Sequence, residues 1–150
     1  MPRISAPFTI TAWDPAPADQ TPWAGAAAPA LGRVTIRKTY TGALDGEATA
    51  DMLTCIADPA DYARGAVYTA LEQFTGRLDG RDGAFVFQHG AVSGGGPAAT
   101  DPAETGLAGT DPAGAVAPNS GTGALAGIRG TVSIQQGPDG HTLTLDYTLP

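Results

Sequence analysis

The sequence predicts an all-β protein, an eight-stranded antiparallel up-and-down β-barrel. Three observations support this prediction. The 150-residue chain contains 21 glycines and 13 prolines, residues that break helices and form turns. Runs of alternating apolar and polar residues recur between the turns, as in half-buried strands. A six-residue pattern, Thr-Gly-x-Leu-x-Gly, occurs three times beside such runs.

The three copies of this pattern span residues 41–46, 75–80 and 122–127. Two glycines around a leucine permit positive φ on both sides of an apolar residue, which suits a hairpin connection. We therefore expect one hairpin that is used three times. A first and a last strand bring the number to eight, and eight strands close into a barrel without exposed sheet edges. The expected strands are 7–13, 33–40, 48–56, 66–74, 84–89, 113–118, 130–136 and 141–149.

Three segments do not fit the strand pattern. Residues 91–120 contain a Gly-Gly-Gly-Pro run and two Thr-Asp-Pro turns, which predicts a mobile insertion before a weak sixth strand. A Pro/Ala-rich connection at 14–29 joins the first two strands, and a helix of one or two turns is expected at 58–64. The chain length fits a single domain over 1–150.

The composition argues against several partners and sites. The net charge is −7, with 8 basic and 15 acidic residues, so the chain lacks the basic face that nucleic acids and anionic membranes require. The single cysteine, Cys55, excludes an intrachain disulfide and favours the reducing cytoplasm. Metal-ligand spacing and a phosphate-binding loop are both missing from the sequence, so we expect neither a metal nor a cofactor.

Strand alternation places three ionisable side chains on apolar, inward faces. Lys38, the only lysine, follows valine and isoleucine in the second strand, Glu72 lies among aromatic residues in the fourth, and His89 follows two phenylalanines in the fifth. A buried charge needs a partner, so we expect Lys38 and Glu72 to pair. The aromatic side chains expected around them, as ligand-binding residues, are Tyr40, Tyr68, Phe74, Phe87 and Tyr147.

Two interpretations of this interior are open. Ionisable groups in an apolar pocket suit an acid–base isomerase or cyclase, with Lys38 and Glu72 as its catalytic pair and His89 as proton carrier or orienting donor. Alternatively, Lys38 and Glu72 form a structural ion pair in a non-catalytic carrier or in a barrel packed solid. The opposite face of the fourth strand, with Val67 and Leu71, is also apolar, which predicts a homodimer or homotrimer.

A resemblance to a known family rests on six segments, which are Phe8–Asp14, Lys38–Gly42, Ala70–Gly76, Phe85–Gly90, Asn119–Gly130 and Leu143–Tyr147. Together they resemble a bacterial family, the domain of unknown function 3224 family. The resemblance implies an antiparallel barrel like that of the allene oxide cyclases, which is lipocalin-like in its up-and-down strand order. Relatives with that barrel close rings in a shaped apolar cavity without a cofactor. The resemblance supplies no catalytic residues, but it favours binding of a small apolar molecule and its isomerisation or cyclisation.

Overall fold

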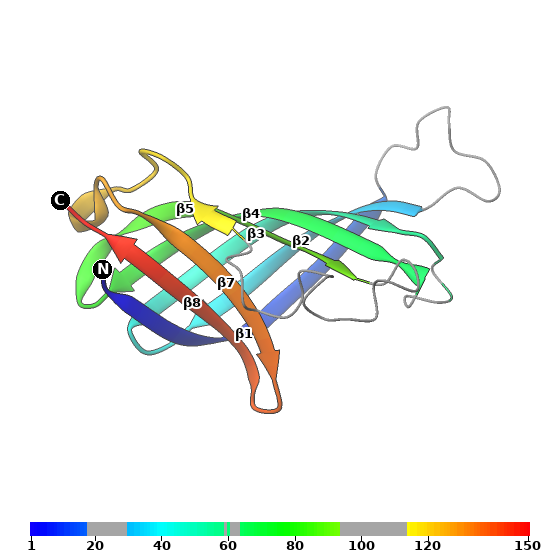
Figure 1. Ribbon diagram of the computed structural model, residues 1–150, viewed down its shortest axis with the longest axis horizontal. Helices are drawn as coiled ribbons and strands as arrows, with labels where there is room; N and C mark the ends of the chain where they lie inside the picture. The colour runs from blue at the N-terminus through cyan, green and yellow to red at the C-terminus, as the bar shows by residue number, and fades with distance from the viewer. Residues whose placement is uncertain (18–29, 59, 61–63, 94–113) are drawn as a thin grey trace.

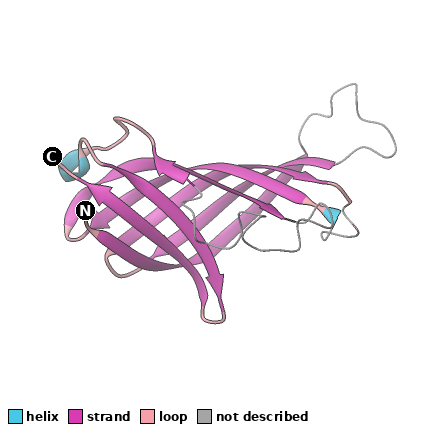
Figure 2. Cartoon of the chain, in the orientation of Figure 1, coloured by secondary structure: helices cyan, strands magenta, loops and turns pink. Residues whose placement is uncertain are grey.

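The computed structural model describes residues 1–17, 30–58, 60, 64–93 and 114–150. Eight antiparallel strands pair in sequence order, and the last pairs with the first, so the predicted closed barrel is confirmed (Figures 1 and 2). The strands are β1 (Arg3–Pro17), β2 (Ala30–Tyr40), β3 (Leu44–Ile56), β4 (Ala66–Leu78), β5 (Arg81–Ser93), β6 (Gly114–Val116), β7 (Arg129–Gly137) and β8 (Gly140–Thr148).

Three predicted segments fall largely outside the described residues. Most of the predicted insertion at 91–120 lies there, although residues 91–93 belong to β5 and 114–116 form β6. Most of the predicted connection at 14–29 and of the predicted helix at 58–64 lies there too. β1 continues to Pro17, beyond its predicted end.

The described strands form a closed half and an open half. β8 pairs with β1 as far as Phe8, and β6 pairs with β5 at Phe87 and Gln88. Beyond these positions β1–β5 continue as a five-stranded sheet (Figure 1). We call the eight-stranded part the closed half and the five-stranded part the open half.

The two halves have different interiors. The closed half is filled by a large apolar core that includes all four phenylalanines of the chain. The open half holds a smaller cluster around Val34 and Met52, against which Tyr68 packs. A small barrel is normally filled by its own side chains, and here this is true of the closed half.

The prediction of one hairpin used three times is wrong in its geometry. The first copy does turn between β2 and β3, where Gly42 has φ +96°. The second lies mostly inside β4, because Gly76 faces Gly46 of the first copy across the β3–β4 ladder and the turn follows at Asp79. The third contains a short 3-10 helix, η3 (Gly123–Leu125), between β6 and β7. Among the described residues no helix has the length and apolarity of a membrane span.

Side-chain hydroxyls extend the short seam that β6 makes with β5. Ser120 Oγ accepts a hydrogen bond from the backbone N–H of Val86, and Thr122 Oγ1 accepts one from that of Ala84. The N–H of Thr122 in turn donates to the carbonyl of Ala84. These bonds satisfy backbone N–H and C=O groups on the part of the β5 edge that the three-residue β6 does not reach.

The outer face of β3–β5 carries several exposed apolar side chains among polar ones. Leu53, Val67, Leu71 and Val92 are exposed there, including the two residues from which the sequence predicts self-association. A homodimer or homotrimer through this face stays a prediction.

Candidate functional site

Glu72 accepts three hydrogen bonds inside the barrel. Its Oε2 accepts from Nζ of Lys38 and Nε2 of His89, each at 2.8 Å, and its Oε1 accepts from the Tyr40 hydroxyl at 2.6 Å. Glu72 is fully buried, and Lys38 and His89 are 5% and 3% exposed. The structure therefore brings the three predicted ionisable residues together, with Tyr40, in one network.

Tyr68 extends the network toward the open half. Its hydroxyl lies 3.2 Å from Nδ1 of His89, and its ring meets the imidazole edge-on. Tyr68 is half-buried, unlike the three ionisable residues. Among the described residues, every buried side-chain nitrogen and oxygen has a hydrogen-bond partner.

Alanines on β3 make room for the network. β3 lies between β2 and β4, with Ala48 opposite Lys38 and Ala50 opposite Glu72. Alternate strands lie about 10 Å apart, and a larger side chain on β3 would fill that gap. Because both residues are alanines, the long Lys38 side chain reaches Glu72 across β3. Its ammonium also lies 4.4 Å from the centroid of the Phe8 ring.

The network keeps Glu72 ionised and Tyr40 protonated. Burial alone would raise the pKa of Glu72, but the hydrogen bond from His89, the charge and hydrogen bond of Lys38 and the hydrogen bond from Tyr40 lower it below its usual value. Burial and the negative charge of Glu72 raise the pKa of Tyr40 well above its usual range. Glu72 therefore acts here as an acceptor, and Tyr40 as a donor.

We expect this carboxylate to make the stability of the fold depend on acid pH. Because the pKa of Glu72 is lowered from 4.5 in the folded state, its stabilisation is complete above that pH and disappears as the pH falls through 4.5 and then through the lower folded value. The free energy of unfolding, measured with urea, should fall more steeply between about pH 5 and about pH 3 for the wild type than for Glu72→Gln.

Asp146 at the surface, whose pKa is lowered by its hydrogen bond with the exposed Arg3, provides the control for that experiment. Asp146→Asn should retain most of the wild-type slope, because solvent screens an exposed pair. Equal slopes for the wild type and Glu72→Gln would contradict the prediction.

A pocket of about 450 Å³ opens at the end of the open half. Its volume lies in the range of small-molecule sites, and its lining is mainly apolar. Of the eight predicted site residues, all within the described ranges, Tyr68 is the one that lines it. The lining residues are Trp13, Pro15, Ala16, Gly32, Arg33, Val34, Met52, Thr54, Ile56, Ala66, Val67, Tyr68 and Ala91.

A β-bulge in β1 turns Trp13 toward this pocket. Ile10 pairs with Lys38 and Ala12 with Arg37, so Thr11 is an extra residue in the ladder. One extra residue exchanges the two faces of a strand. Trp13 therefore pairs with the inward-facing Ile36 and lies on the inner side, where it is 54% exposed. Simple alternation from the buried Phe8 places Trp13 outside, which is why sequence reasoning missed it.

The other predicted ligand-binding residues do not line this pocket. Tyr40, Phe74 and Phe87 are fully buried in the core of the closed half. Tyr147 lies at the far end of that half, where its hydroxyl donates to Asp79 in the β4–β5 turn. A ligand-binding role for these four stays a prediction.

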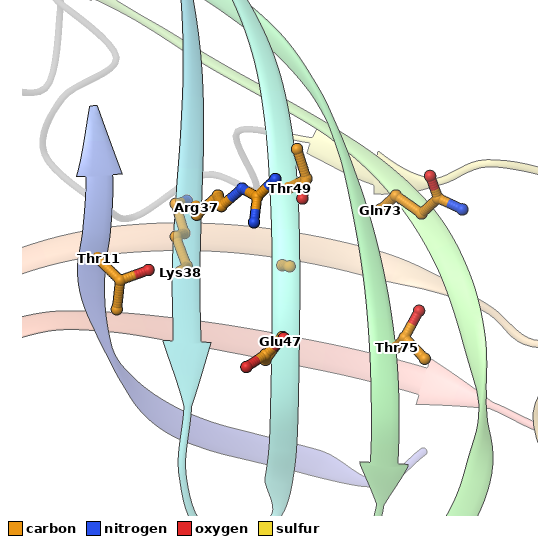
Figure 3. Close-up of a pocket in the computed structure, with 8 residues that line it drawn as sticks. Thr11, Arg37, Lys38, Glu47, Thr49, Gln73 and Thr75 are labelled. Carbon is orange, nitrogen blue, oxygen red and sulfur yellow. The ribbon is translucent and has the colours of Figure 1, made fainter. Parts of the chain in front are cut away.

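A second hollow, of about 410 Å³, lies across β1–β4 (Figure 3). Its side chains are mostly polar and exposed, with Arg37 on β2, Glu47 and Thr49 on β3, and Gln73 and Thr75 on β4. These side chains alternate with the inward-facing ones, so they belong to the outer face of the sheet. Lys38 of the buried network also lines this hollow, so both hollows adjoin the network. The apolar pocket differs in its mainly apolar lining, to which Tyr68 belongs.

Comparison with known proteins supports the resemblance seen in the sequence. Residues 4–147 match the family described as "Protein of unknown function (DUF3224)". A crystal structure of a protein of unknown function from that family, from Shewanella oneidensis MR-1, is 26% identical with a TM-score of 0.74, and the match covers 100% of this chain and 98% of that one. No curated protein matches the chain. This chain therefore belongs to the DUF3224 family.

Proposed function

We propose that this barrel binds a small, largely apolar molecule in the pocket at the end of its open half. The observation that carries the proposal is the pocket itself, about 450 Å³ with a mainly apolar lining. Trp13 presents an exposed aromatic face on its inner side, and Val34 and Met52 supply apolar walls. Concave apolar sites with a few polar groups are typical of ligand binding.

A second candidate function, cofactor-free isomerisation or cyclisation, is favoured by the hydrogen-bonded chain behind the pocket. Tyr68 contacts His89, which contacts Glu72. In this function His89 would exchange a proton with a bound molecule by way of the Tyr68 hydroxyl. Lys38 would then be a positioning residue that holds Glu72 ionised. In a carrier the same chain would only orient the ligand, and the ligand would leave unchanged.

Filling the pocket tests the binding proposal. Ala91 lines the pocket opposite Tyr68, whereas the adjacent Val92 points outward and is exposed. We expect Ala91→Phe to weaken binding of the apolar fluorescent probe N-phenyl-1-naphthylamine by about tenfold or more, equivalent to about 1.4 kcal/mol, because the new ring occupies the space of the probe. Fluorescence titration measures this.

Val92→Phe is the matched control, since it adds the same ring to the outer face. It should leave the affinity for the probe unchanged. The proposal fails if the wild type does not bind the probe, or if the two variants weaken binding equally.

A further inference from the structure

The position of the hydrogens in the buried network follows from Glu72. A carboxylate can only accept hydrogen bonds, and its Oε2 lies 2.8 Å from Nε2 of His89, so that nitrogen carries a hydrogen. Nζ of Lys38 lies 2.8 Å from the same oxygen, so the lysine ammonium already neutralises Glu72. A second positive charge on the buried His89 would have no counter-ion. His89 is therefore neutral, and its Nδ1 carries a lone pair.

This lone pair sets the direction of the hydrogen bond from Tyr68. The Tyr68 hydroxyl lies 3.2 Å from Nδ1 of His89 and donates its hydrogen to that nitrogen. Burial and the negative charge of Glu72 raise the pKa of Tyr68, so the hydroxyl keeps its hydrogen. With this one hydrogen committed, the hydroxyl oxygen can only accept a further hydrogen bond.

Tyr68 is the group that makes the pocket selective. Tyr40 also donates into the network, but it is fully buried in the closed half and does not line the pocket. Thr54 lines the pocket, but a threonine hydroxyl rotates to donate or accept as needed. Arg33 also lines the pocket, but it alternates with the inward-facing Val34 and its side chain is exposed on the outer face of β2. Because the Tyr68 hydroxyl can only accept a further hydrogen bond, it discriminates between ligands that donate and ligands that only accept.

We propose that the pocket selects a small alcohol or phenol, whose apolar body packs in the open half and whose O–H donates to the hydroxyl oxygen of Tyr68. This inference rests on the proposed binding function and adds the chemical class of the ligand. An ether or an aldehyde of the same shape has no hydrogen to donate, so it leaves the Tyr68 oxygen unpaired.

Three matched compounds test the inference by displacing N-phenyl-1-naphthylamine from the wild-type protein. They are 4-tert-butylphenol, which donates, and 4-tert-butylanisole and 4-tert-butylbenzaldehyde, which only accept. We expect the phenol to bind about tenfold more tightly than the other two, as one net hydrogen bond allows. In Tyr68→Phe the preference should vanish while the anisole keeps its affinity, and in the control Tyr147→Phe the preference should remain.

The outcomes separate this inference from the binding proposal. Equal affinities, a preference for the aldehyde, or a phenol preference that survives Tyr68→Phe would each overturn the inference and leave binding intact. If the three compounds fail to displace a bound probe, the inference is overturned. A probe that does not bind at all overturns the proposed function as well.

A second measurement reads the hydrogens directly and needs no ligand. The chain has two histidines, so ¹⁵N spectra of the ring nitrogens can be assigned with a His141→Gln variant. We expect a neutral His89 ring with its hydrogen on Nε2 and a bare Nδ1 at neutral pH. A protonated Nδ1 would mean that Tyr68 donates toward the pocket, which overturns the inference.

Discussion

Replacing Glu72 by alanine is expected to lower the free energy of unfolding by about 3–5 kcal/mol, because it leaves a buried charge without its partner. Lys38 would remain 5% exposed inside the barrel, and Tyr40 and His89 would lose their acceptor. Whole domains are stable by about 5–15 kcal/mol, so this change alone removes a large part of the total. Urea unfolding at neutral pH measures it.

Two further variants show whether the charge or the space is responsible. Lys38→Met combined with Glu72→Leu removes both charges and keeps apolar volume, and such exchanges are often neutral or stabilising. We expect the double variant to unfold at a urea concentration above that of Glu72→Ala. Glu47→Gln, on the exposed face of β3, should change little. A double variant no more stable than Glu72→Ala would contradict the ion-pair explanation.

A methyl group at Gly76 is expected to cost about 3 kcal/mol, the upper end of the usual range for overpacking. A Cβ there would lie 2.2 Å from the carbonyl oxygen of Asp45 and 2.8 Å from Cα of Gly46. Main-chain atoms obstruct it, so a side-chain rotation cannot relieve the clash. β3 and β4 approach closely at this level because two glycines face each other.

Gly137→Ala is the matched control for Gly76→Ala. Gly137 lies near the β7–β8 turn, and the nearest atom to its added Cβ is 3.9 Å away. Thermal or urea unfolding should show almost no change there. Similar losses in the two variants would mean that a general property of glycine, rather than the contact between Gly46 and Gly76, sets the cost.

Strand alternation was sufficient to predict the inward residues of the barrel. A two-residue period needs no knowledge of register, so Lys38, Glu72 and His89 could be placed inside from the sequence alone. Their mutual contact needed one more fact, the register that sets them at one level. Tyr147 shows this limit, because it also points inward but at the far end of the closed half.

The pocket was harder to predict, for two physical reasons. The extra residue Thr11 exchanges the faces of β1 and brings Trp13 to the inner side. The residue pattern around Thr11 does not indicate this bulge. The division into a closed and an open half depends on where β6 and β8 stop pairing. Such edges are set by contacts between distant segments, so a residue pattern does not reveal them.

The pairing of β1 with β8 has a consequence for how the chain reaches its fold. Arg3 and Asp146, which pair across this ladder, are 143 positions apart, whereas β3, β4 and β5 follow one another along the chain as antiparallel neighbours. Contacts between near neighbours form early, and contacts across a long loop form late. On the ribosome the chain must therefore remain an unclosed sheet with bare edges, a state prone to aggregation, until β8 has emerged.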